Sequence, residues 1–140
     1  MMAAAREAIE PFGAQRPILI AVTVLTSFSQ ACLDVLGVNK SIEQQVVDLA
    51  LLARQSGLDG VVCSPHEVAT LKAQCGQSFL AVTPGIRLDG DDKGDQHRIA
   101  TPTQAITMGA DYLVIGRSIT RAIEPTEIIR KILATITKLP

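Results

Sequence analysis

The chain contains the stretch Val82-Thr-Pro-Gly-Ile-Arg-Leu-Asp-Gly-Asp-Asp-Lys-Gly-Asp-Gln-His-Arg98, which continues the apolar run Phe79-Leu-Ala-Val82. The apolar run predicts a short buried strand, because a brief apolar segment before a turn signal is typical of one. Pro84-Gly85 then ends the strand, and Gly90 and Gly94 permit backbone angles that other residues avoid. The loop carries side chains that can donate hydrogen bonds, namely Arg87, Lys93, Gln96 and Arg98.

A second stretch, Tyr112-Leu-Val-Ile-Gly-Arg117, repeats this plan of a buried strand, a glycine at its end and an arginine. Glycine lets backbone N–H groups approach a ligand closely, and arginine binds phosphate through two parallel hydrogen bonds. Two strand ends of this kind therefore predict an anion site. The motif is not specific by itself, because charged loops after strands are common in α/β proteins and surface arginines are usually solvated.

The order of the elements strengthens this prediction. In parallel barrels, a phosphate site is frequently built from the loops after the last two strands and a short extra helix. Here the two stretches supply the last two predicted strands, and Ser118-Ile-Thr-Arg-Ala122 is suited to the short helix. A phosphate site at this end of a parallel sheet is therefore the favoured interpretation.

Strands and helices alternate along the rest of the chain. Three helix starts are marked by capping boxes, in which a Ser or Thr and a Glu or Gln three residues later cap each other; they begin at Ser41, Ser64 and Thr101. We expect strands over residues 17–26, 58–63, 79–82 and 112–115, and helices over residues 1–9, 41–57, 64–76, 101–109 and from Pro125 onward. This order predicts right-handed crossovers and a parallel sheet, which is an α/β fold.

Every predicted strand is apolar on both faces, so both faces must be covered. Two architectures satisfy this requirement, a doubly wound open sheet and part of a (β/α)8 TIM barrel. A complete barrel needs roughly 200–250 residues, whereas this chain has 140. Residues 1–140 are therefore expected to form a single domain, and a partial one if the barrel is correct.

The composition is that of an ordinary globular protein, with 47% hydrophobic residues, 19% charged residues and a formal net charge of -1. This near-neutral balance argues against nucleic acid or a membrane surface as the partner. The three cysteines, Cys32, Cys63 and Cys75, lack metal-ligand spacing, so we expect reduced thiols and a cytoplasmic location, with Cys63 buried. We expect neither a metal nor a cofactor.

Five motifs stand in a fixed order along the chain. They are Ala21-Val-Thr-Val-Leu-Thr-Ser27, Gly57-Leu-Asp-Gly-Val-Val-Cys-Ser64, Val82-Thr-Pro-Gly-Ile-Arg87, Gly94-Asp-Gln96 and Val114-Ile-Gly-Arg117. Together they resemble the orotidine 5'-phosphate decarboxylase family over essentially the whole chain. The resemblance implies a carboxy-lyase of pyrimidine synthesis that converts orotidine 5'-monophosphate to uridine monophosphate. It also implies half of a (β/α)8 barrel, since the motifs look like strands five to eight with their helices.

The resemblance implies substrate-binding roles for five residues. Arg87 and Gln96 would lie on a mobile loop that closes over the substrate phosphate. Gly116 and Arg117 would hold that phosphate from the eighth strand of the barrel. Thr26 would form a hydrogen bond near the pyrimidine ring, at the end of the fifth strand.

The family's catalytic groups, a lysine and an Asp-x-Lys-x-x-Asp array, follow its second and third strands, so the resemblance implies no catalytic residue in this chain. The run Asp89-Gly-Asp-Asp-Lys-Gly-Asp95 has a similar composition but lies in the predicted phosphate loop. Lys93 in that run should contribute less to phosphate affinity than Arg117, because lysine is a point charge on a flexible stem. Met1 resembles an internal methionine of a longer frame.

Three functions remain open from the sequence. The chain is the substrate-gripping half of a decarboxylase and inactive alone, a non-catalytic half-barrel that binds phosphorylated ligands, or a related phosphosugar barrel enzyme. Thr26 and Gln96 argue against the third, because they match nucleotide contacts of the family. A half-barrel would leave strand edges unpaired at residues 18–26 and 112–115, so we expect a homodimer or association with a complementary half-barrel.

Overall fold

The computed structural model describes residues 1–92, 94 and 96–137, and it contains a parallel sheet with the strand order β1-β2-β3-β4. The strands are β1 (Ile20–Val22), β2 (Gly60–Val62), β3 (Leu80–Thr83) and β4 (Tyr112–Leu113). Each strand pairs in parallel with the next one along the chain. The prediction of a parallel sheet whose strands alternate with helices is confirmed.

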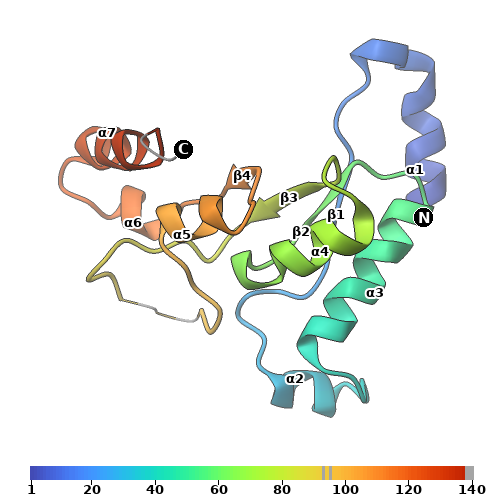
Figure 1. Cartoon of the computed structure of the whole chain (residues 1–140), viewed down its shortest axis with the longest axis horizontal. Helices are drawn as coiled ribbons and strands as arrows, with labels where there is room; N and C mark the ends of the chain where they lie inside the picture. The colour runs from blue at the N-terminus through green and yellow to red at the C-terminus, as the bar shows by residue number, and fades with distance from the viewer. Residues whose placement is uncertain (93, 95, 138–140) are drawn as a thin grey trace.

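The helices lie between the strands and at both ends of the chain (Figure 1). They are α1 (Met2–Ile9), η1 (Glu10–Gln15), α2 (Gln30–Val35), α3 (Ile42–Gln55), η2 (Pro65–Glu67), α4 (Val68–Cys75), α5 (Pro102–Thr107), α6 (Arg117–Thr120) and α7 (Pro125–Ile136). The short helix expected after the last strand is α6, which begins one residue earlier than predicted. Among the described residues, none of these helices combines the length and the apolar character that a membrane crossing requires.

Local capping explains where several helices begin. The capping boxes at Ser64 and Thr101 are complete, with both reciprocal hydrogen bonds present. The box at Ser41 forms only in part. Its hydroxyl accepts from the Gln44 N–H at 3.1 Å, but the Gln44 side chain donates to Asp48 at 2.8 Å instead of returning to the cap. A competing acceptor one turn further along the helix accounts for this difference.

Three of the four strands, β1, β2 and β4, are shorter than the runs that predicted them, whereas β3 has the predicted length and is shifted by one residue. The run 17–26 yields only β1, extended by one ladder contact from the Thr23 N–H to the Val62 carbonyl at 3.1 Å. The chain then turns, with the Phe28 N–H donating to the Leu25 carbonyl at 2.9 Å. An apolar run indicates burial, whereas a strand ends where the neighbouring backbone no longer pairs with it. Predicted length therefore exceeded the paired length.

One face of the sheet packs against α3 and α4. The register aligns Ala21 with Val61 and Val61 with Ala81, and Val61 is fully buried. Val46 from α3 and Leu71 from α4 belong to the same buried core. This core stabilises the sheet from one side, as expected for helices that cover parallel strands.

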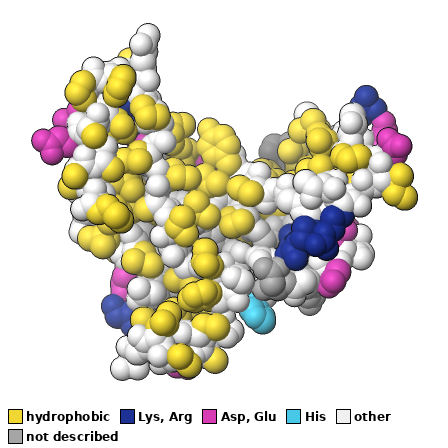
Figure 2. All heavy atoms as spheres, turned by 180° about the vertical axis from the view of Figure 1, so that it is seen from behind, with side chains coloured by type: hydrophobic (Ala, Val, Ile, Leu, Met, Phe, Trp, Pro, Cys, Tyr) yellow, Lys and Arg dark blue, Asp and Glu magenta, His cyan; other side chains and the backbone are white. Residues whose placement is uncertain are grey.

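The other face of the sheet is open in the described part of the chain. The next row of aligned residues is Val22, Val62, Val82 and Tyr112, and its two outer members are 59% and 52% exposed. Viewed from behind, the molecule shows hydrophobic side chains spread over much of its surface (Figure 2). In the described part of the chain, α3 and α4 therefore cover one face of the sheet, and the apolar face that a complete barrel would enclose is exposed.

An aspartate before β2 fixes the start of the sheet. Asp59 donates its N–H to the Leu19 carbonyl at 2.8 Å, and its carboxylate accepts the Leu19 N–H at 2.8 Å. Both carboxylate oxygens also accept from the Arg16 guanidinium, at 2.6 and 2.7 Å. The Arg16 hydrogen bond lowers the pKa of Asp59 to about 2, so this carboxylate stays ionised at neutral pH.

The same arrangement recurs before β4. Asp111 donates its N–H to the Ala81 carbonyl at 3.0 Å and accepts the Ala81 N–H at 2.7 Å. The cation here is Lys72 from α4, whose ammonium lies 2.7 Å from the carboxylate. The two aspartates set the register of β1 with β2 and of β3 with β4.

Candidate functional site

The carboxyl ends of β1, β3 and β4 lead into loops that meet at one end of the sheet. Because all four strands run in parallel, their ends lie at the same edge, where ligands bind in sheets and barrels of this kind. Two hollows lie there, and their residues come from loops that are far apart in the sequence.

The first hollow, which we name the arginine pocket, has a volume of about 150 Å³. It is lined by Arg87, Asp91, Asp92, Gly94, Arg117, Ser118 and Arg121. Arg87 is buried, and it donates to the Ile86 carbonyl at 2.8 Å. Its Nε is also buried and has no hydrogen-bond partner among the described residues. A buried donor without an acceptor is costly, so the pocket favours a ligand that brings an acceptor.

Gly94 brings the loop directly against the Arg117 side chain. Its φ is +59°, and a Cβ there would lie 2.7 Å from Nη1 of Arg117. The positive φ favours glycine at this position, and a side chain there would also have to shift the end of the Arg117 guanidinium. The loop after β3 and the end of β4 are thus in contact, as the two glycine-arginine motifs predicted.

The acidic residues of the arginine pocket shape the loop. The Leu88 N–H donates to Asp91 at 2.9 Å, and the Gly94 N–H donates to Asp92 at 3.0 Å. The neighbouring Ser118 hydroxyl and the Leu88 N–H lower the pKa of Asp91, so it is ionised at neutral pH. Among its described residues, the pocket therefore contains three guanidinium groups and two carboxylates.

The second hollow, which we name the threonine pocket, has a volume of about 210 Å³. It is lined by Val22, Val24, Leu25, Thr26, Ser27, Val62, Cys63, Pro84 and Gln96. The Thr26 hydroxyl donates to the side-chain oxygen of Gln96, across seventy positions of sequence. Most of the wall is apolar, and a few polar groups stand at one side, which is the usual make-up of a small-molecule site.

The structure brings the predicted site residues together in two groups. Arg87 and Arg117 line the arginine pocket, and Thr26 and Gln96 line the threonine pocket. Gly116 directly precedes Arg117 and has open space where a side chain would be. Their roles in binding a substrate stay predictions. Lys93 and Asp95 lie outside the described residues, so the expected contrast between Lys93 and Arg117 stays a prediction as well.

Three comparisons place the chain among known proteins. Residues 1–132 match the family model described as "Orotidine 5'-phosphate decarboxylase / HUMPS family". The chain belongs to this family. It is 54% identical over 136 residues to the orotidine 5'-phosphate decarboxylase of Actinobacillus pleuropneumoniae serotype 5b, covering 97% of this chain and 59% of that relative. The corresponding protein of Legionella pneumophila strain Corby is 52% identical over 133 residues, covering 95% of this chain and 58% of the relative.

Among solved structures, the orotidine 5'-phosphate decarboxylase of Lactobacillus acidophilus is similar at 37% identity, with a TM-score of 0.79. The match covers 97% of this chain and 58% of that one. The chain therefore spans somewhat more than half the length of the relatives it matches. Its four parallel strands and their helices are the corresponding part of the family's (β/α)8 barrel, which confirms the barrel prediction over the doubly wound alternative.

The sequence reasoning missed four residues of the arginine pocket, Asp91, Asp92, Ser118 and Arg121. Arg121 follows Arg117 by four positions, and this spacing puts two side chains on one side of a helix. That signal was present in the sequence. The aspartates carried no comparable signal, because acidic residues in a loop are most often solvated.

The sequence places Arg98 among the cations of the loop, but in the structure its side chain is directed to groups of the protein itself. Its guanidinium pairs with Glu67 and donates to the backbone carbonyls of Val24 and Leu25, at 3.0 and 2.9 Å. Burial raises the pKa of Glu67, whereas the positive charge of Arg98 opposes that rise. Arg98 therefore serves the architecture of the site, and it lines neither pocket.

The cysteines differ in exposure, and they do not form a metal site. Cys63 lies at the end of β2 with 1% exposure, as predicted, and burial raises the pKa of its thiol to about 12. Cys75 is also buried, whereas Cys32 is exposed. In the described residues, no three His, Cys, Asp or Glu side chains gather in a way that could hold a metal ion.

A larger hollow of about 650 Å³ lies at the opposite end of the sheet, beside Arg16 and Asp59. These two side chains already satisfy each other in the ion pair before β2. Their hydrogen bonds serve the sheet register, so we assign the functional site to the two pockets at the carboxyl end.

We expect Gly85→Ala to destabilise the chain more than Gly90→Ala does. Both glycines have a φ near +80°, so each alanine meets the backbone strain of roughly 1 kcal/mol. A Cβ at Gly85 would in addition lie 2.7 Å from the Arg98 carbonyl oxygen, whereas Gly90 has nothing within 4 Å. Urea midpoints measured side by side test this, and equal shifts would show that the base of the loop can adjust.

Proposed function

We propose that this chain provides the substrate-binding part of an orotidine 5'-phosphate decarboxylase. The observation that carries the proposal is the arginine pocket, where the loops after β3 and β4 bring Arg87 and Arg117 together beside the threonine pocket. The relatives whose printed name is orotidine 5'-phosphate decarboxylase are similar over nearly all of this chain. A substrate with a phosphate at one end and a flat polar ring at the other fits this pair of pockets.

In this proposal the arginine pocket holds the phosphate. Arginine offers a planar fork of donors that matches two phosphate oxygens, and it stays charged at any physiological pH. The buried Nε of Arg87 would gain an acceptor, and the approach of Gly94 to Arg117 would close the pocket from the loop side. Gly116 would leave room for the phosphate beside the Arg117 backbone.

The threonine pocket would receive the pyrimidine ring. Its valines and Pro84 offer apolar contact, and the Thr26 hydroxyl and the Gln96 amide supply hydrogen bonds that a ring with carbonyl and N–H groups can use. Gln96 belongs to the same loop as Arg87, so ring and phosphate would be held by one segment. This pairing favours a nucleotide over a simple phosphosugar, which is the alternative within the family.

The chemical step would depend on groups that this chain does not supply. Decarboxylation leaves a developing carbanion, which needs a proton donor within hydrogen-bond reach. Neither pocket is lined by a lysine in the described residues. We therefore assign binding to this chain and the proton transfer to the lysine and aspartate array of the family.

We further propose that the open strands are covered by another half-barrel. The edge residues Ile18 and Val22 on one side, and Tyr112 and Val114 on the other, are each more than 50% exposed. Unpaired edges beside large apolar side chains promote association. Two copies could pair β1 of one with β4 of the other and close eight strands around an axis. Soluble nucleotide substrates and reduced thiols both fit a cytoplasmic location.

We expect Arg117→Ala to weaken binding of uridine monophosphate to the purified chain by about ten-fold or more, because a charge-assisted hydrogen bond contributes roughly 1.5–3 kcal/mol. Isothermal titration calorimetry measures this loss. Arg130→Ala is the matched control, since Arg130 is exposed on α7 and pairs only with Glu127 among the described residues. Equal affinities for the two variants would reject the assignment of the arginine pocket.

We expect the purified chain to show no turnover of orotidine 5'-monophosphate, because the proposal places the proton donor in the part of the family's barrel that this chain does not match. Expression in a host without its own decarboxylase removes contaminating activity, and release of carbon dioxide is the readout. Adding the amino-terminal part of the Actinobacillus relative is expected to restore turnover. Activity of the chain by itself would show that the donor lies within it.

We expect the chain to be a dimer or a larger assembly, or to aggregate, when it is expressed alone. Light scattering over a dilution series gives the mass, which for one chain is 14.9 kDa. Replacing the exposed edge residue Val22 by Lys is expected to shift the series toward smaller species, because charged edges resist pairing. A stable monomer at all concentrations would contradict the proposed pairing.

A further inference from the structure

We propose that Arg98 is a positioning residue that fixes the Thr26–Gln96 pair and so sets the affinity for the ring end of the ligand. This inference rests on the proposed function for the identity of the ligand. Its structural part concerns the hold of Arg98 on the loop after β3, which can be tested without any ligand.

The side chain of Arg98 connects its own loop with two other segments, the one that contains Glu67 and the one that follows β1. One nitrogen, Nη1, pairs with Glu67 at the start of the helix pair η2–α4. The other, Nη2, donates to the carbonyls of Val24 and Leu25, which follow β1. The Arg98 and Glu67 side chains are 14% and 6% exposed, so water screens this ion pair little.

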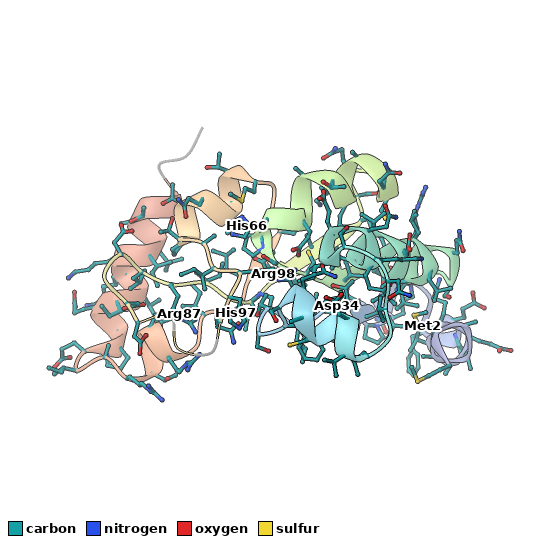
Figure 3. All side chains as sticks on the ribbon, turned by 90° about the horizontal axis from the view of Figure 1, so that it is seen from below. Met2, Asp34, His66, Arg87, His97 and Arg98 are labelled. Atoms are coloured by element: carbon teal, nitrogen blue, oxygen red, sulfur yellow. The ribbon has the colours of Figure 1, made fainter. Side chains whose placement is uncertain are left out.

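The main chain around Arg98 is hydrogen-bonded to Thr26. The N–H groups of His97 and Arg98 both donate to the Thr26 carbonyl, at 3.1 and 3.4 Å. The Arg98 carbonyl in turn lies against Gly85 at the other base of the loop. Figure 3 shows Arg98 between the half of the molecule that carries Arg87 and the half that carries α2.

The contacts of Arg98 lie next to the Thr26–Gln96 pair of the threonine pocket. Gln96 lies two positions before Arg98, and its side chain accepts from the Thr26 hydroxyl. Arg98 therefore holds both partners of this pair. Its guanidinium binds the Val24 and Leu25 carbonyls, which directly precede Thr26, and its backbone follows Gln96 by two positions. Loss of the Arg98 contacts would let the two ends of the pair move apart.

The backbone around Arg87 has contacts that do not involve the Arg98 side chain. The Arg87 N–H donates to the Ala100 carbonyl at 3.0 Å, and Ile86 pairs with Ala100 in a parallel bridge. Arg117 belongs to α6 on another segment. A variant at Arg98 should therefore disturb the ring end much more than the phosphate end, and a loss of general stability would not show this difference.

Two variants test the inference. Arg98→Lys keeps the charge but lacks the fork that reaches a carboxylate and two carbonyls at once. Arg98→Met combined with Glu67→Gln removes the guanidinium without leaving a buried carboxylate unpaired, which protects the fold. Far-ultraviolet circular dichroism and urea unfolding show that each variant is folded before it is used.

The first measurement is hydrogen exchange of single amides by NMR. In both variants, the backbone amides at positions 97 and 98 are expected to exchange at least about ten-fold faster, because their hydrogen bonds to the Thr26 carbonyl open more often. The Cys63 amide, which donates to the Val82 carbonyl at 3.1 Å within the sheet, is expected to keep its rate. Unchanged exchange at His97 and Arg98 would overturn the inference, and so would an equal rise at Cys63.

The second measurement compares two ligands, uridine monophosphate and ribose 5-phosphate, by calorimetry. The variants are expected to lose about ten-fold in affinity for uridine monophosphate and less than about two-fold for ribose 5-phosphate. Equal losses for both ligands would overturn the inference. If the unmodified chain binds neither ligand, the proposed function fails, and the exchange rates alone decide whether Arg98 holds the loop.

Discussion

Asp59 and Asp111 each exchange two hydrogen bonds with a residue of the preceding strand segment, one through the backbone N–H and one through the carboxylate. A one-residue slip of a strand would break both bonds and turn its side chains to the wrong face. Each aspartate is held by a cation, Arg16 in one case and Lys72 in the other. Because the amino ends of the strands are aligned in this way, their carboxyl ends are aligned too, and the loops that form the two pockets meet.

The two ends of the sheet use charge differently. At the amino end, ions are paired within the chain, and the hydrogen bond from Arg16 lowers the pKa of Asp59 below its usual range. At the carboxyl end, the described residues of the arginine pocket include three arginines and two aspartates, and within that same set the buried Nε of Arg87 has no acceptor. In parallel barrels, residues at the amino end of the strands likewise stabilise the fold, and residues at the carboxyl end bind ligands.

Much of the fold followed from local signals, and much of the site did not. The complete capping boxes at Ser64 and Thr101 depend on neighbours three residues apart, so the sequence alone revealed them. The glycine-arginine motifs likewise marked the arginine pocket. The position of Arg98 depends on carbonyls more than seventy positions away, and no local pattern records such a contact. An apolar strand also indicates that cover is needed, but it cannot say which chain provides that cover.

The buried thiol of Cys63 stands in the wall of the threonine pocket, at the end of β2. Thiol reagents attack the thiolate, and a pKa of about 12 leaves almost none of it at neutral pH while the sheet is intact. Cys32 is exposed and would consume reagent at once. Cys75 on α4 is buried as well, so it would have to be replaced by serine before a slow second phase of alkylation could be assigned to Cys63 and to opening of the strands. The reactivity of Cys63 would thus report how often the sheet opens, at a position next to the pocket whose shape that opening would destroy.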